Sequence, residues 1–61
     1  MASNFEVYKD NIGEFRWKLI HTNGQVIASS GEGYTTKVNA IGGIKSVKGN
    51  TPAAVIEDKT V

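Results

Sequence analysis

Alternating apolar and polar positions predict three β-strands in the first half of the chain. The segments are FEVYKD (5–10), EFRWKLIH (14–21) and QVIASS (25–30). Successive side chains of a strand point to opposite faces, so a period of two gives each strand one face for a core. The residues expected on the core faces are Phe5 and Val7 in the first segment, Phe15, Trp17, Leu19 and His21 in the second, and Val26 and Ala28 in the third.

The first turn sets how two of these strands align. A four-residue loop would place Val7 opposite Arg16 and mix the two faces. A three-residue loop, Asn11–Gly13 with Gly13 left-handed, instead pairs Val7 with Trp17 and Phe5 with Leu19. A slip of one residue would turn every side chain of the first strand to the other face, so we expect the three-residue loop.

The dipeptide Asn23-Gly24 predicts the second turn, as a two-residue type I′ hairpin. Residues directly opposite one another share a face, so this turn would gather Trp17, Leu19, Val26 and Ala28 on one side. The expected pairs are Thr22 with Gln25, His21 with Val26, Ile20 with Ile27, and Leu19 with Ala28.

A helix is expected after Tyr34, where the period changes. Thr35 or Thr36 can cap its start, and Gly49-Asn50 is typical of a helix end. Gly42 and Gly43 within it each cost about 1 kcal/mol relative to alanine, so both indicate a close approach to the sheet face that holds Trp17. The apolar stripe of this helix is Ala40, Ile41, Ile44 and Val47.

The segment AAVIED predicts a short last strand, Ala54 to Asp58, which completes a β-β-β-α-β unit of the α+β class. One helix on a three-stranded meander is a thin core, and the last strand has no certain partner within the chain. Two copies can solve both problems by continuing one sheet and exchanging their tails. The residues of the expected dimer-forming tail are Ala54, Val55, Ile56, Glu57 and Asp58.

Composition narrows the possible functions. Sixty-one residues make one domain, residues 1–61 with an ordered core of about 5–58, and such a chain buries only about 60% of its unfolded surface. It has no cysteine and one histidine, so disulfides and thiolate metal sites are excluded and no metal or cofactor is expected. No leader segment or stretch of roughly 20 apolar residues is present, so we expect a cytoplasmic protein without a membrane partner. The seven basic residues are scattered and the net charge is +1, which argues against nucleic acid as the partner.

The segments FEVYKD, GEFRWKL, NGQVIASSGEGYTTK and GIKSVKGNTPAA closely resemble the YegP-like family of small bacterial domains of unknown function. The resemblance covers about Phe5 to Asp58. It implies a β-β-β-α-β unit that occurs as a tandem repeat or as a single copy that pairs with itself, with one sheet and exchanged C-terminal strands. A single unit then implies a homodimer. Two glycines, Gly42 and Gly49, depart from the family pattern, and the family carries no known activity to transfer.

The corner between the third strand and the helix, GEGYTTK, is a candidate anion site. Glycines let backbone N–H groups approach a phosphate, and a helix N-terminus adds a positive dipole end. The spacing matches neither a dinucleotide fingerprint nor a P-loop, and Glu32 would repel a phosphate. A structural corner is therefore the favoured interpretation. The residues that would bind an anion are Gly31, Gly33, Thr35, Thr36 and Lys37.

The remaining candidates favour a module without enzyme activity. His21 has no orienting partner nearby and is expected at the rim of the core. Ser29 and Ser30 lack a nucleophile elbow, and no two carboxylates are placed across a cleft. The outer sheet face is a candidate interaction surface, formed by Tyr8, Arg16, Lys18, Ile20 and Ile27. We therefore expect a structural or protein-interaction module that pairs with itself. The alternatives are anion binding at the corner and an active site assembled across the dimer.

Overall fold

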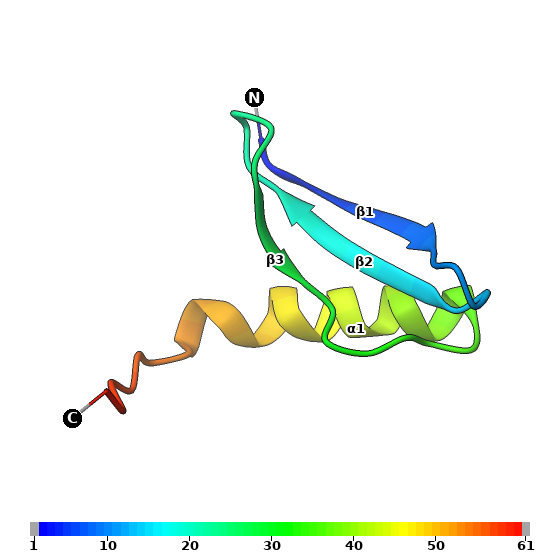
Figure 1. Ribbon diagram of the computed structural model, residues 1–61. Coiled ribbons are helices and arrows are strands. Elements are labelled where there is room, and N and C mark those ends of the chain that lie inside the picture. Colours follow the sequence, from blue (N-terminus) through cyan, green and yellow to red (C-terminus); the bar gives the residue numbers. More distant parts are fainter. Residues whose placement is uncertain (1, 61) are drawn as a thin grey trace.

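The computed structural model describes residues 2–60, which form a three-stranded antiparallel sheet with one helix against one face (Figure 1). The elements are β1 (Asn4–Lys9), β2 (Phe15–Ile20), β3 (Val26–Ser29), α1 (Lys37–Asn50) and a 3₁₀ turn, η1 (Thr51–Ala53). The strands lie in the order β1-β2-β3. The predicted α+β class, with a meander on one helix, is confirmed. Met1 and Val61, the ends of the predicted domain, lie outside the described residues.

The hairpin between β1 and β2 has the predicted register. Val7 pairs with Trp17 and Phe5 with Leu19. The Asp10 N–H donates to the Glu14 carbonyl at 2.8 Å, which closes a three-residue loop. Gly13 has a φ of 85°, the left-handed conformation that this loop requires.

The hairpin between β2 and β3 differs from the prediction. The His21 N–H donates to the Gln25 carbonyl and the Gly24 N–H to the His21 carbonyl, both at 2.8 Å, so the loop has three residues, 22–24. A type I′ turn needs a positive φ at both central residues. Gly24 has one, at 90°, but no described residue other than glycine does. The predicted pairs of Thr22 with Gln25, His21 with Val26 and Ile20 with Ile27 are therefore wrong.

A bulge in β3 compensates for the longer loop. Ile20 pairs with Val26 and Leu19 with Ala28, so Ile27 has no partner opposite it. The predicted pairing of Leu19 with Ala28 is thus confirmed. Val26 instead lies opposite Ile20 and leaves the core face that the two-residue turn would have given it.

Helix α1 begins where the sequence predicts. Thr36 is its N-cap, and the Thr36 hydroxyl accepts the Asn39 N–H at 3.1 Å. Gly43 makes the predicted close approach, because a Cβ there would lie 3.3 Å from Trp17 Nε1 and 2.5 Å from Tyr34 Oη. Gly42 does not make one, since a Cβ there would meet nothing within 4 Å.

The core is small and lies between β2 and α1. Trp17 is 7% exposed, Ala40 is fully buried and Ile44 is nearly so. The Phe5 ring packs edge-on against Trp17, with ring centroids 5.6 Å apart. Trp17 therefore has the core position that its alternation predicts, whereas Ile41, also assigned to the stripe, is exposed at the edge of the helix.

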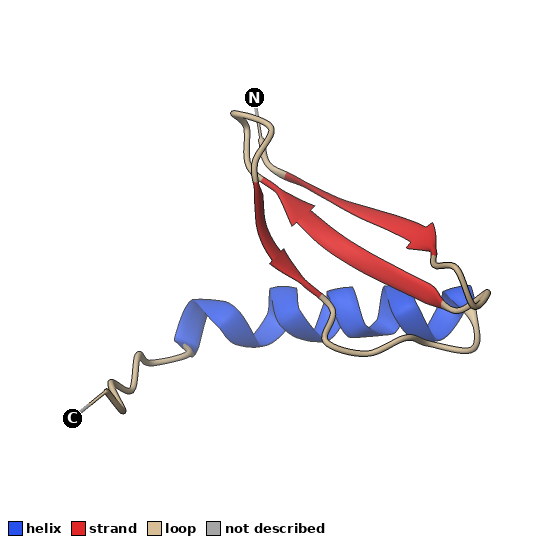
Figure 2. Cartoon of the chain, in the orientation of Figure 1, coloured by secondary structure: helices blue, strands red, loops and turns tan. Residues whose placement is uncertain are grey.

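Strand β3 and the C-terminal tail lie outside this core. Helix α1 packs against β1 and β2 but not β3, and every residue of β3 is exposed. Residues 54–60 form no strand within the chain, and Figure 2 shows them as a loop that extends away from the sheet. The predicted last strand, Ala54 to Asp58, is therefore absent from the single chain, which offers no strand beside it.

Candidate functional site

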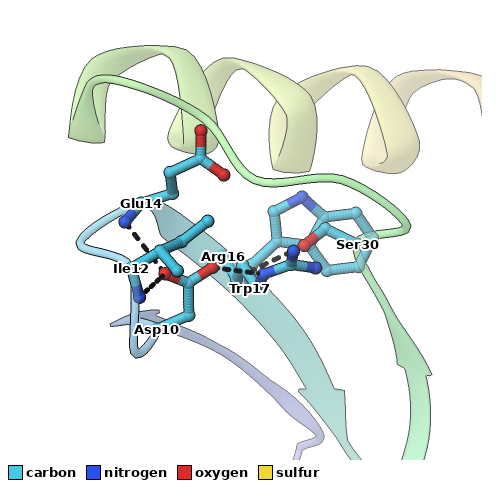
Figure 3. Close-up of polar contacts among 6 residues, drawn as sticks. All are labelled: Asp10, Ile12, Glu14, Arg16, Trp17 and Ser30. Carbon is cyan, nitrogen blue, oxygen red and sulfur yellow. Dashed lines mark hydrogen bonds and ion pairs between the residues drawn. The ribbon is translucent and has the colours of Figure 1, made fainter.

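The corner after β3 is held to β2 by hydrogen bonds. The Ser30 N–H donates to the Trp17 carbonyl at 2.9 Å, and the Ser30 hydroxyl accepts the Trp17 N–H at 3.2 Å (Figure 3). Ser30 is buried, and its side chain thus replaces a backbone carbonyl in the ladder. Further along, Tyr34 and Phe15 exchange two backbone hydrogen bonds of 2.8 Å. Between these two contacts, residues 31–33 form a short loop that makes no backbone hydrogen bond to β2.

The residues of the candidate anion site have separate surroundings within this corner. Gly33 lies against the side chain of Glu14, and a Cβ at Gly33 would come within 2.9 Å of the Glu14 Cβ and closer still to its carboxylate. A carboxylate at this point repels an anion. The Thr36 hydroxyl caps α1. The three other candidate residues, Gly31, Thr35 and Lys37, are exposed.

The outer sheet face does bring together the predicted aromatic and basic side chains, but they pair within the sheet. Arg16 Nε lies 2.7 Å from Asp10 Oδ2. Lys18 Nζ lies 5.2 Å from the centre of the Tyr8 ring and 3.9 Å from Glu6 Oε1. Lys18 therefore makes a cation–π contact with Tyr8, while Arg16 is paired with Asp10. The other members of this surface, Ile20 and Ile27, lie toward β3, where Ile27 is exposed in the bulge.

Asp10 organises the first hairpin, a role that the sequence reasoning missed. Its Oδ1 accepts the N–H groups of Ile12 at 3.0 Å and Glu14 at 2.9 Å (Figure 3). The Arg16 guanidinium, together with these N–H groups, holds the pKa of Asp10 below its ordinary value of 3.8. The same contact raises the pKa of Arg16. An aspartate at the first position of a turn was the available signal.

The other candidates are dispersed. His21 is exposed beside the second loop, where its Nδ1 accepts the Asn23 N–H at 3.1 Å, so its predicted place at the core rim is wrong. Within residues 2–60 no three histidine or acidic side chains gather as metal ligands, and no pocket is formed. No helix in this part of the chain has the length and apolar character needed to span a membrane.

The tail residues predicted to form the dimer interface are almost fully exposed to solvent. Val55 is 82% exposed and Ile56 is 97% exposed. The polar contacts of the tail are local: Asp58 accepts the N–H and hydroxyl of Thr60, and Lys59 lies 3.6 Å from Glu57. Two adjacent aliphatic side chains, near the start of the tail, are thus exposed to solvent.

Comparison with known proteins gives one consistent family. A UPF0339 protein of Treponema denticola is 50% identical over 58 residues, which cover 93% of this chain and 98% of the relative. A UPF0339 protein encoded in the 5′ region of the ptx operon of Stutzerimonas stutzeri is 48% identical, and the match covers 85% of this chain but 46% of that relative.

A solved structure supports the fold. The solution structure of a protein from Haloferax volcanii superposes with a TM-score of 0.88 at 46% identity, over 93% of this chain and 95% of that one. The family model described as a domain of unknown function, DUF1508, matches residues 10–58. The YegP-like resemblance is thereby confirmed: the chain belongs to the DUF1508 (UPF0339) family, whose function is unknown.

Proposed function

We propose that this protein is a non-enzymatic interaction module that works as a homodimer, in which two copies continue one sheet and exchange the tails Ala54–Asp58. The observation that carries the proposal is the excess of exposed surface. The chain exposes 4871 Å², whereas a compact monomer of 6.6 kDa exposes about 3,900 Å². The excess of about 1,000 Å² resembles the roughly 800 Å² that each partner buries in a standard interface.

The shape of the chain agrees with this excess. Its radius of gyration is 13.1 Å, compared with about 10.5 Å for a compact domain of 61 residues. The surface in question lies on β3, which α1 leaves uncovered, and on the tail with Val55 and Ile56. A strand that is open along one edge and an extended apolar segment are suited to pair with each other. Within one chain they lie apart, so the proposed pairing uses two chains.

The Stutzerimonas relative adds support. This chain spans less than half of that protein, which therefore has room for a second unit of similar size. Two units joined in one chain would provide what two separate copies provide in the proposed dimer.

Multi-angle light scattering of the full chain tests the proposal. We expect twice the monomer mass of 6.6 kDa at a chain concentration of about 100 μM. Deletion of residues 54–61, and the single change Ile56→Asp, should both shift the mass toward the monomer. Ile12→Asp is the matched control, because Ile12 is 77% exposed but lies in the first hairpin loop.

Two results would contradict this proposal. A monomeric full chain would remove the homodimer. A dimer of unchanged mass after both the deletion and Ile56→Asp would exclude the tail from the interface.

A further inference from the structure

Helix α1 carries more positive charge than the net charge of the whole chain indicates. The helix has three lysines and no acidic residue, while the chain as a whole has a net charge of +1. Lys37, Lys45 and Lys48 are all exposed. The ion pairs among residues 2–60 involve Arg16, Lys18 and Lys59, so none of the helix lysines is neutralised by a carboxylate.

The helix lysines share one face with exposed aliphatic side chains. At about 100° per residue, the three lysines, Val38 and Ile41 fall within an arc of about 100°, beside the buried face that holds Ala40 and Ile44. Val38 is 78% exposed and Ile41 is 36% exposed. The face is therefore both basic and partly apolar, a combination that the chain itself does not use.

Two glycines on this side of the helix leave its backbone uncovered by side chains. A Cβ at Gly42 or at Gly49 would meet nothing within 4 Å, so neither glycine serves the packing of this chain. Val38, Gly42, Lys45 and Gly49 follow one another at spacings of four, three and four residues. This spacing forms a seam along a helix into which the side chains of a second helix can pack.

We infer that this face of α1 docks an acidic amphipathic helix of a partner protein. The inference rests on the proposed role as an interaction module and names the chemistry of the partner, but it does not depend on the dimer. The docking face is defined as Lys37, Val38, Ile41, Gly42, Lys45, Lys48 and Gly49.

Charge and shape together favour this occupant over others. A phosphate backbone would match the lysines but would offer Val38 and Ile41 no apolar surface. A membrane-surface helix needs a broad apolar face, often with aromatic residues, and two aliphatic side chains do not supply it. A second copy would present the same lysines and be repelled. An acidic amphipathic helix can match both the charges and the apolar side chains.

The test is a titration of the ¹⁵N-labelled full chain, followed by amide NMR. The probe is a synthetic 21-residue helix with leucine at the a and d positions of three heptads and glutamate at e and g. Its control is a peptide of the same composition in shuffled order. We expect the acidic helix to shift the amides of Val38, Ile41, Gly42, Lys45 and Gly49, and the shuffled peptide to leave them in place.

Charge reversal makes the test specific. Lys45→Glu/Lys48→Glu should weaken binding of the acidic helix by about tenfold or more. The same variant should gain binding to a probe with lysine in place of glutamate. Lys18→Glu/Lys59→Glu changes the net charge equally but lies off the docking face, so it should bind like the unchanged chain.

Several outcomes would overturn the inference. These are equal shifts with the shuffled peptide, shifts confined to the sheet, no shift at millimolar probe, or stronger binding of duplex DNA or of phosphatidylglycerol vesicles through the same residues. The helix variants leave the tail intact and the tail variants leave the helix intact. Failure of docking and failure of the dimer are therefore observed separately.

Discussion

Trp17 and Gly43 face each other across the core, so that a methyl group added at Gly43 would press against the indole and clash with the Tyr34 hydroxyl. A Cβ at Gly43 would lie 3.3 Å from the indole Nε1, and within 2.5 Å of the Tyr34 hydroxyl. The indole Nε1 is itself buried without a hydrogen-bond partner among the described residues. The absent side chain at Gly43 thus allows the helix to cover Trp17.

The two adjacent glycines of α1 should respond to alanine in opposite directions. Gly43→Ala is expected to destabilise the fold by about 1–3 kcal/mol, because a methyl group would be forced into a filled core. Gly42→Ala should stabilise it by about 1 kcal/mol through helix propensity, since its Cβ would meet only open space. Urea unfolding followed by circular dichroism measures both, and a shift of the same sign in the two variants would contradict this packing.

Ser30 should matter more than its neighbour Ser29. Ser30→Ala removes the hydroxyl that accepts the Trp17 N–H and leaves that buried donor unpaired, at a cost of about 1–3 kcal/mol. Ser29→Ala, at an exposed position of β3, should change the unfolding free energy by less than about 0.5 kcal/mol. Equal unfolding midpoints for the two variants would show that the Ser30 hydroxyl does not replace a carbonyl in the ladder.

Asp10 should give the fold a dependence on acid. Its folded pKa lies below the ordinary 3.8, so its contribution to stability is complete above that value and is lost as the pH falls through the folded pKa. The hydrogen bond from Arg16 is the largest cause of the lowered pKa, so Arg16→Gln should raise the pKa of Asp10. The pKa of Asp58, lowered mainly by the hydroxyl and N–H of Thr60, should not change. Carboxyl NMR titration of the two chains measures both, and an unchanged Asp10 would rule out the Arg16 contact as the cause.

Inorganic phosphate should leave the corner after β3 unaffected. The Glu14 carboxylate lies against Gly33 and would repel an anion. The Asn39 N–H at the start of α1 already donates to the Thr36 hydroxyl, so it is not free to bind an anion. We expect no amide shift from Gly31 to Lys37 in a phosphate titration of the labelled chain. Shifts confined to those residues would instead favour anion binding, and Glu14→Gln should then strengthen them.

The two hairpins show what the sequence could and could not predict. The register of β1 on β2 followed from requiring Phe5 and Val7 to share a face with Trp17, because only one loop length satisfied it. No such test applied to β3. A two-residue turn, and a three-residue loop with a bulge, both place Ala28 opposite Leu19 and differ in the face that Val26 takes. Because Val26 and Ile27 are both aliphatic, the apolar pattern does not distinguish the two arrangements.

The candidate surfaces were harder to predict, because their residues are separated in the sequence. Asp10 and Arg16 are six residues apart and meet only because the first hairpin closes. The helix lysines appeared scattered along the chain, although their angular positions on α1 already placed them on one face. The same angles separate Gly43, on the buried side, from Gly42, on the exposed side.

The bulge at Ile27 has a consequence for how this hairpin can evolve. The residue that the loop gains, relative to a two-residue turn, is absorbed by the unpaired Ile27, so Leu19 and Ala28 remain opposite each other. Deleting Ile27 would remove the bulge and still leave that pair aligned. The number of residues in this part of β3 therefore has little effect on the alignment of the core residues. A chain without Ile27 should therefore keep the core pair of Leu19 and Ala28 with no compensating change elsewhere.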